Sequence, residues 1–101
     1  MHLIQILLPV RDNEGHPFSL HDYEEVAGTL AKRFGGITAY NRAPAEGRWE
    51  TSGKIQHDDV LVMEVMVESL DKRWWGDFRA QLEAKFRQNQ IIVRGQLIEL
   101  L

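Results

Sequence analysis

Three polar side chains interrupt three otherwise apolar stretches of the sequence. Gln5 stands among leucines and isoleucines, Glu64 among valines and methionines, and Arg94 among isoleucine, valine and leucine. A guanidinium, an amide and a carboxylate in an apolar frame can orient a small molecule, with Arg94 holding an oxyanion and Glu64 moving a proton. The same groups can instead pair with each other across an interface between two chains and fix its register.

Most other chemistries lack the residue types they need. The 101 residues include no cysteine, which excludes thiol nucleophiles, thiolate metal sites and redox CxxC motifs. The 4 histidines have neither HxH nor HxxxH spacing, so no metal is expected. Neither GxGxxG nor GxxxxGK[ST] occurs, and no cofactor is expected.

A basic and aromatic group consists of Tyr40, Arg42, Arg48 and Trp49. Such side chains can stack bases. However, no RNP-type signature is present and the net charge is −3, so nucleic acid is not an expected partner. Tyr40, Arg42 and Trp49 are instead candidates for the rim of a pocket.

The apolar start of the chain predicts a strand. Residues 3–10 fall far short of the ~20 apolar residues of a membrane span. They also lack the basic flank and small-residue cleavage site of a secretory signal. No membrane partner is expected, and the expected compartment is the cytoplasm.

Hydrophobic alternation predicts the strands that carry the three polar groups. Residues 3–10, 59–68 and 91–100 each alternate between an apolar side and a mixed side. A shorter strand is predicted over residues 37–41. Residues 48–57 predict a hairpin arm that turns at the Ser-Gly pair in its middle.

Capping residues predict two helices. Ser19 is a good N-cap for the first helix, and the glycine pair at 35–36 ends it. The second helix is predicted to start near Asp71 and to end at Asn89. Within it, the spacing of Glu83 and Arg87 predicts an ion pair on the exposed side.

The order β-α-β-β-α-β predicts an α+β, ferredoxin-like fold in a single domain over residues 1–101. Four antiparallel strands form the sheet, and right-handed crossovers place both helices on one face. The last strand then lies beside the first, and the first beside the third. Gln5, Glu64 and Arg94 therefore fall in one row on the helix-free face.

The helix-free face is too apolar to be simply left in water, because large apolar patches usually mark interfaces or ligand grooves. One interpretation is a homodimer with its sheets packed face to face. The other is a small-molecule cavity on this face. The two can coexist.

Several segments resemble a group of small bacterial proteins of unknown function. They are residues 33–40, 45–49, 64–67 and 86–94. At the level of the fold the chain also resembles the dimeric α+β-barrel superfamily, which includes cofactor-free quinol monooxygenases, muconolactone-isomerase-like enzymes and small stress-linked proteins. The reaction-carrying motifs of those groups are absent, so the resemblance implies no catalytic residue.

Two functions of different classes follow. The first is a small dimeric protein with a ligand-binding or interaction role. The alternative is a cofactor-free enzyme, monooxygenase- or isomerase-like, that acts on an aromatic or enolisable metabolite.

Overall fold

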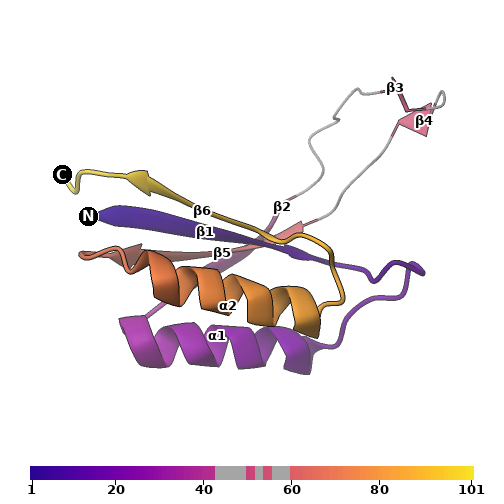
Figure 1. Cartoon of the computed structure of the whole chain (residues 1–101), viewed down its shortest axis with the longest axis horizontal. Coiled ribbons are helices and arrows are strands. Elements are labelled where there is room, and N and C mark those ends of the chain that lie inside the picture. Colours follow the sequence, from indigo (N-terminus) through magenta and orange to yellow (C-terminus); the bar gives the residue numbers. More distant parts are fainter. Residues whose placement is uncertain (43–49, 52–53, 56–59) are drawn as a thin grey trace.

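The chain folds into a four-stranded sheet, two helices and a short hairpin. The computed structural model describes residues 1–42, 50–51, 54–55 and 60–101. The elements are β1 (His2–Pro9), α1 (Leu20–Phe34), β2 (Thr38–Arg42), β3 (Glu50–Thr51), β4 (Lys54–Ile55), β5 (Val60–Val67), α2 (Lys72–Lys85) and β6 (Ile92–Leu97) (Figure 1).

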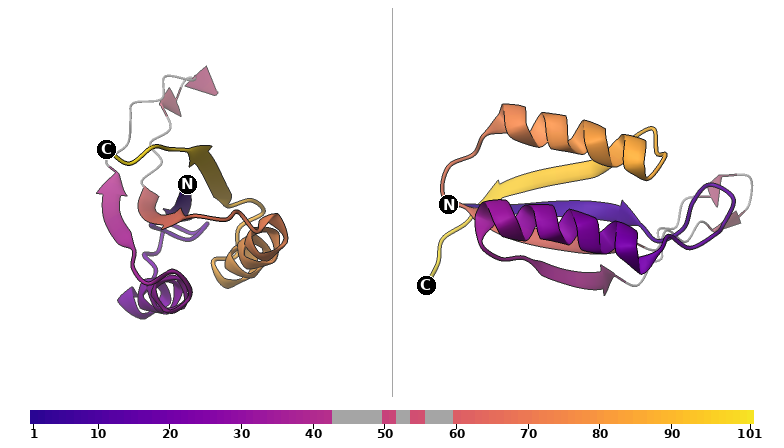
Figure 2. Two further views of the ribbon diagram at one scale, coloured as in Figure 1. Left: turned by 90° about the vertical axis from the view of Figure 1, so that its left-hand side faces the viewer. Right: turned by 90° about the horizontal axis from the view of Figure 1, so that it is seen from below.

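The main sheet has the strand order β2-β5-β1-β6, and all its neighbouring strands are antiparallel. Both helices lie on one face of this sheet, and its strands curve around them (Figure 2). The βαββαβ order confirms the predicted α+β, ferredoxin-like fold. β3 and β4 pair with each other outside the sheet, where the hairpin arm is predicted.

The core lies between the sheet and the helices. Alternate residues of β1 form its floor, and Ile4, Ile6 and Leu8 expose only 2%, 0% and 0% of their surface. Burial of one such side chain contributes about 1.5–3 kcal/mol to the free energy of unfolding. The other buried members of the cluster are Val26, Leu30, Met63, Val65, Val67, Trp75, Phe78, Leu82, Phe86 and Ile91.

The helix ends follow their capping residues. Ser19 Oγ accepts a hydrogen bond from Asp22 N at 3.3 Å, and Asp71 Oδ1 accepts one from Trp74 N at 3.1 Å. Gly35, at the end of α1, has a φ of 85°, a left-handed conformation that glycine adopts without a steric penalty. Its backbone N–H donates to Ala31 O.

The second helix ends earlier than predicted, at Lys85 rather than Asn89. Arg87 lies beyond this end and has a left-handed φ of 52°. The predicted ion pair between Glu83 and Arg87 is wrong, because i,i+4 spacing no longer aligns side chains once the helix has ended. Glu83 Oε2 instead accepts a hydrogen bond from Ile91 N at 2.9 Å.

The last strand is also shorter than predicted. β6 ends at Leu97, and Ile98 N then donates to Met1 O at 3.0 Å. Leu100 and Leu101 follow as exposed residues.

Candidate functional site

The strand register brings four polar residues into one row across the helix-free face. Gln5 of β1 lies opposite Glu64 of β5 on one side and Arg94 of β6 on the other. Glu64 in turn lies opposite Thr38 of β2. We call Thr38, Glu64, Gln5 and Arg94 the polar row. Its last three members have the order expected from the sequence, whereas Thr38 was not anticipated.

The members of the polar row differ in their contacts. Arg94 Nε donates a hydrogen bond to Gln5 Oε1 at 2.9 Å. Gln5 and Glu64 are half-buried, whereas Arg94 is exposed. Within the described part of the chain, the Glu64 carboxylate has no hydrogen bond or ion pair. Arg94 therefore reaches Gln5 but not Glu64, and it is exposed because β6 is an edge strand of the sheet.

Apolar residues border the polar row on both sides. On one side Tyr40, Val62, Leu7 and Ile92 lie opposite one another in four strands. Val62 is 1% exposed although no helix covers it, whereas Ile92 is 48% exposed. On the other side, a hollow of about 630 Å³ begins at Thr38 and Glu64. Its further lining residues are Leu3, Phe34, Gly35, Gly36, Ile37, Val65, Met66 and Ile98.

This arrangement suits a ligand that carries charge of both signs. The Arg94 guanidinium can bind a carboxylate or another oxyanion. The Glu64 carboxylate can accept hydrogen bonds from an ammonium or hydroxyl group, or take a proton from it. Gln5 fills the space between them, and its amide nitrogen remains able to donate because its oxygen accepts from Arg94.

The three rim candidates fare differently. Tyr40 lies on the helix-free face, 40% exposed and opposite Val62. The backbone of Arg42 ends β2 opposite Val60. Trp49 lies outside the described residues.

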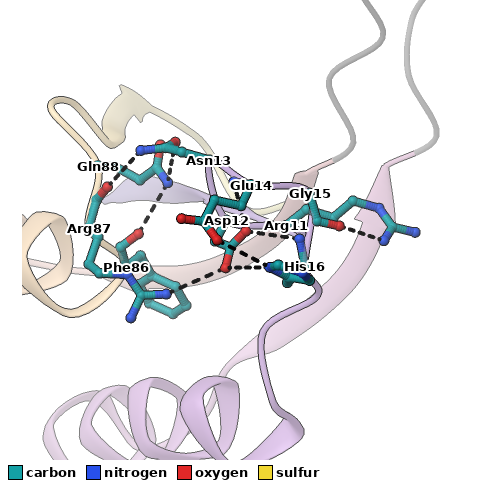
Figure 3. A network of polar contacts seen from close by, with 9 residues as sticks. All are labelled: Arg11, Asp12, Asn13, Glu14, Gly15, His16, Phe86, Arg87 and Gln88. Atoms are coloured by element: carbon teal, nitrogen blue, oxygen red, sulfur yellow. Dashed lines mark hydrogen bonds and ion pairs between the residues drawn. The ribbon is translucent and has the colours of Figure 1, made fainter.

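A second polar cluster, around Asp12, was not found from the sequence (Figure 3). Asp12 Oδ1 accepts hydrogen bonds from the backbone N–H groups of Glu14 and His16, both at 2.9 Å. Asp12 Oδ2 lies 3.6 Å from His16 Nδ1 and 3.7 Å from Arg87 Nη2. The cluster joins the loop after β1 to the loop after α2.

The Asp12 carboxylate is held in its charged form. The hydrogen bond from His16 N lowers its pKa most, and the hydrogen bond from Glu14 N lowers it further. Partial burial acts in the opposite direction, and the nearby His16 and Arg87 add smaller lowering effects. In the sequence, Asp12 looks only like part of a turn, since no local pattern shows that Arg87 lies opposite.

Two kinds of site receive no support within residues 1–42, 50–51, 54–55 and 60–101. No three or more histidine, aspartate or glutamate side chains gather where they could hold a metal ion. None of the helices there has the length and apolar character needed to cross a membrane.

No family model and no curated protein matches the chain. Solved structures do resemble it. CutA1 from Pyrococcus horikoshii has a TM-score of 0.57 at 14% identity, over 100% of this chain and 86% of that one. A phage SAM lyase in complex with S-methyl-5′-thioadenosine has a TM-score of 0.52 at 19% identity, over 94% of this chain and 79% of that one.

A third similar structure is CutA from Archaeoglobus fulgidus, described as a periplasmic divalent cation tolerance protein. Its TM-score is 0.52 at 19% identity, over 99% of this chain and 86% of that one. At these identities the likeness shows a shared fold, and function has to be argued from the residues of this chain.

Proposed function

We propose that this chain is a self-associating protein that binds a small molecule with both an anionic and a hydrogen-bond-donating group on its helix-free face. The observation that carries the proposal is the polar row in its apolar border. Arg94 and Glu64 stand on either side of Gln5, with opposite charges and with no bond between them. A ligand with a carboxylate and an ammonium group would satisfy both.

The apolar border supports a second copy of the chain as the cover of this face. Met66 and Ile92 expose 54% and 48% of their surface on a sheet face without a helix. The polar row has an acid at one side and a base at the other. A two-fold axis that passes over Gln5 parallel to the strands would place Arg94 of each copy near Glu64 of the other, and the ligand would bind between these two charges at the interface. The proposed assembly is a homodimer.

Ligand binding is tested by thermal denaturation with SAM and with S-methyl-5′-thioadenosine, because a phage protein of this fold is a SAM lyase solved with the second compound. SAM carries a carboxylate and an ammonium group, whereas S-methyl-5′-thioadenosine carries neither. SAM at 100 times its Kd should add about 2.7 kcal/mol to the free energy of unfolding. Arg94→Met should reduce this gain.

Arg73→Met is the matched control, because Arg73 is an exposed arginine of α2 without a contact in the described residues. It should leave the gain from SAM unchanged. A gain that is undiminished in Arg94→Met, or a wild-type protein that SAM does not stabilise, would contradict binding of this ligand at the polar row.

Self-association is tested by light scattering after size exclusion. The wild type should have about twice the chain mass of 11.7 kDa. Met66→Glu, on the helix-free face, should give a monomer. Leu20→Glu replaces an exposed leucine at the start of α1 and should not. A monomeric wild type at micromolar concentration would rule out the dimer.

One observation favours the alternative of a cofactor-free enzyme. The half-buried Glu64 carboxylate has no partner in the described chain and lies on the same face as Arg94, as a general base beside an oxyanion anchor would. Glu64→Gln should then abolish conversion of SAM, or of an enolisable metabolite, while the ligand still binds. Chromatography of the reaction mixture measures the product. If the wild type converts neither compound, the enzyme alternative is disproved and the binding role remains.

A further inference from the structure

A second hollow, of about 620 Å³, lies at the end of the sheet where β1 ends and β6 begins. Its apolar floor includes Leu7, Val60 and Ile92, which come from three adjacent strands. The rest of its lining comes from the end of β1 and from the loops after β1 and after α2. The volume falls in the range of about 300–1,000 Å³ that is usual for small-molecule sites.

The rim of this hollow is held in place by contacts between the two loops (Figure 3). Asn13 Nδ2 donates to Arg87 O at 3.4 Å, and Gln88 Nε2 donates to Asn13 Oδ1 at 3.4 Å. The ion pair of Arg87 with Asp12 adds a third link. Because these contacts form within the chain itself, the rim is ordered before a ligand arrives, which lowers the entropic cost of binding.

The polar groups at the rim offer a ligand one guanidinium and one amide. Asp12 lines the hollow, but its carboxylate already faces two N–H groups, His16 and Arg87. Arg11 Nη1 donates to Gly15 O at 3.2 Å, which holds the plane of the guanidinium. The exposed Gln90 amide has no contact in the described residues, so both its oxygen and its nitrogen remain for a ligand.

We propose that this hollow binds a flat heteroaromatic ring of the purine type that carries a donor and an acceptor side by side on its edge. A glutamine amide pairs with such an edge through two hydrogen bonds, as in the recognition of adenine N6 and N7. The Arg11 guanidinium can stack on the ring. Leu7, Val60 and Ile92 provide the apolar surface beneath it.

The ring site lies next to the polar row. The inference that one ligand occupies both sites rests on the proposed function. Leu7 follows Gln5 by two residues in β1, and Ile92 precedes Arg94 by two residues in β6. All four residues lie on the same face. Two residues of a strand span about 7 Å. A nucleoside with a charged side chain would therefore reach from the hollow to the polar row.

Calorimetric titration with adenosine tests the hollow alone, because adenosine has no charged group for the polar row. Inosine, in which a carbonyl replaces the amino group, is the comparison ligand. The wild type should prefer adenosine, and Gln90→Ala should weaken adenosine binding at least tenfold and remove the preference. Gln81→Ala, which changes an exposed glutamine of α2 outside the hollow, should do neither.

Different results disprove the ring site and the ligand site at the polar row. Arg94→Met should leave adenosine binding unchanged although it reduces the effect of SAM. If adenosine binds and Gln90→Ala weakens it, the ring site stands whatever the polar row does. If millimolar adenosine does not bind the wild type, or binds Gln90→Ala equally well, the ring site is disproved. Because Gln90 is exposed, an unchanged melting temperature will show that its variant is folded.

Discussion

The two faces of the sheet are built from alternate residues of the same strands and differ in nearly every property. On the helix-covered face, Ile4, Ile6 and Leu8 are almost completely buried and belong to the apolar core cluster. On the helix-free face, the half-buried Leu3 and Leu7 flank the polar Gln5. One strand thus contributes to folding on one side and presents a polar group on the other.

The difference shows where recognition can be placed at little cost in stability. A polar side chain on the helix-covered face would lose its hydration without gaining a partner, at a cost of roughly 1–3 kcal/mol. On the helix-free face, Arg94 and Glu64 keep contact with water, so their charges remain available for a ligand or for a second chain. The core can therefore stay wholly apolar while the opposite face carries the polar row.

Truncation of two neighbouring leucines of β1 is the strongest test of the contrast between the two faces of the sheet. Leu8→Ala removes a fully buried side chain and should lower the free energy of unfolding by about 2–5 kcal/mol. Leu7→Ala, on the other face, should cost well under half as much in the isolated chain. Urea denaturation at low protein concentration measures both. Equal losses would mean that the helix-free face is packed as tightly as the core.

The fold was accessible from the sequence because its signals are local. Ser19, Asp71 and Gly35 stand at the helix ends they predict, and alternation assigns the residues of β1 and β5 to their faces. Antiparallel pairing then decides which residues are neighbours. For this reason the sequence alone places Gln5, Glu64 and Arg94 in one row.

The details of the site were not accessible, because they depend on contacts between distant residues. Asp12 and Arg87 are brought together by two loops whose shapes no spacing rule predicts. The exposure of Arg94 depends on the edge position of β6, and its bond to the Gln5 amide depends on a rotamer. Whether the polar row binds a ligand or a second chain depends on molecules outside this sequence.

A smaller effect is expected at Gly95 of β6, which lies opposite Ile4 on the helix-covered face. A Cβ atom at this position would lie 2.8 Å from Ile4 Cδ1, which is in the core. Gly95→Ala should therefore destabilise the protein by about 1–3 kcal/mol through overpacking. Gly76→Ala is the control, because a Cβ atom there meets nothing within 4 Å and alanine favours a helix. It should stabilise the protein by up to about 1 kcal/mol in thermal denaturation, and destabilisation by both changes would refute the steric argument.

The Asp12 cluster should show itself as a pH dependence of stability. The pKa of Asp12 is lower in the folded chain than the ordinary value of about 3.9. Its stabilising effect is therefore complete above that value and is lost as the pH falls through the folded-state pKa. The free energy of unfolding of the wild type should fall between about pH 5 and pH 3. The fall should be smaller in Asp12→Asn. Asp77→Asn changes an exposed residue of α2 and should behave like the wild type. If Asp12→Asn loses as much free energy of unfolding as the wild type, the pH dependence comes from other groups.

The smallest effect on folding is expected at the polar row itself. Arg94 is exposed and its contact is with an amide, so Arg94→Met should cost only about 0–1 kcal/mol in the dilute, monomeric chain. If a second copy covers the face, the same change should raise the dimer dissociation constant, because Glu64 then loses its opposite charge inside the interface. Adding Glu64→Gln should restore part of the association, since no unpaired carboxylate is left to be buried. Sedimentation measures the dimer dissociation constant, and urea denaturation measures the free energy of unfolding. Arg73→Met is the control in both experiments. A loss of several kcal/mol in the monomer would instead place Arg94 among the residues that hold the fold together, and the contrast between the two faces would not extend to β6.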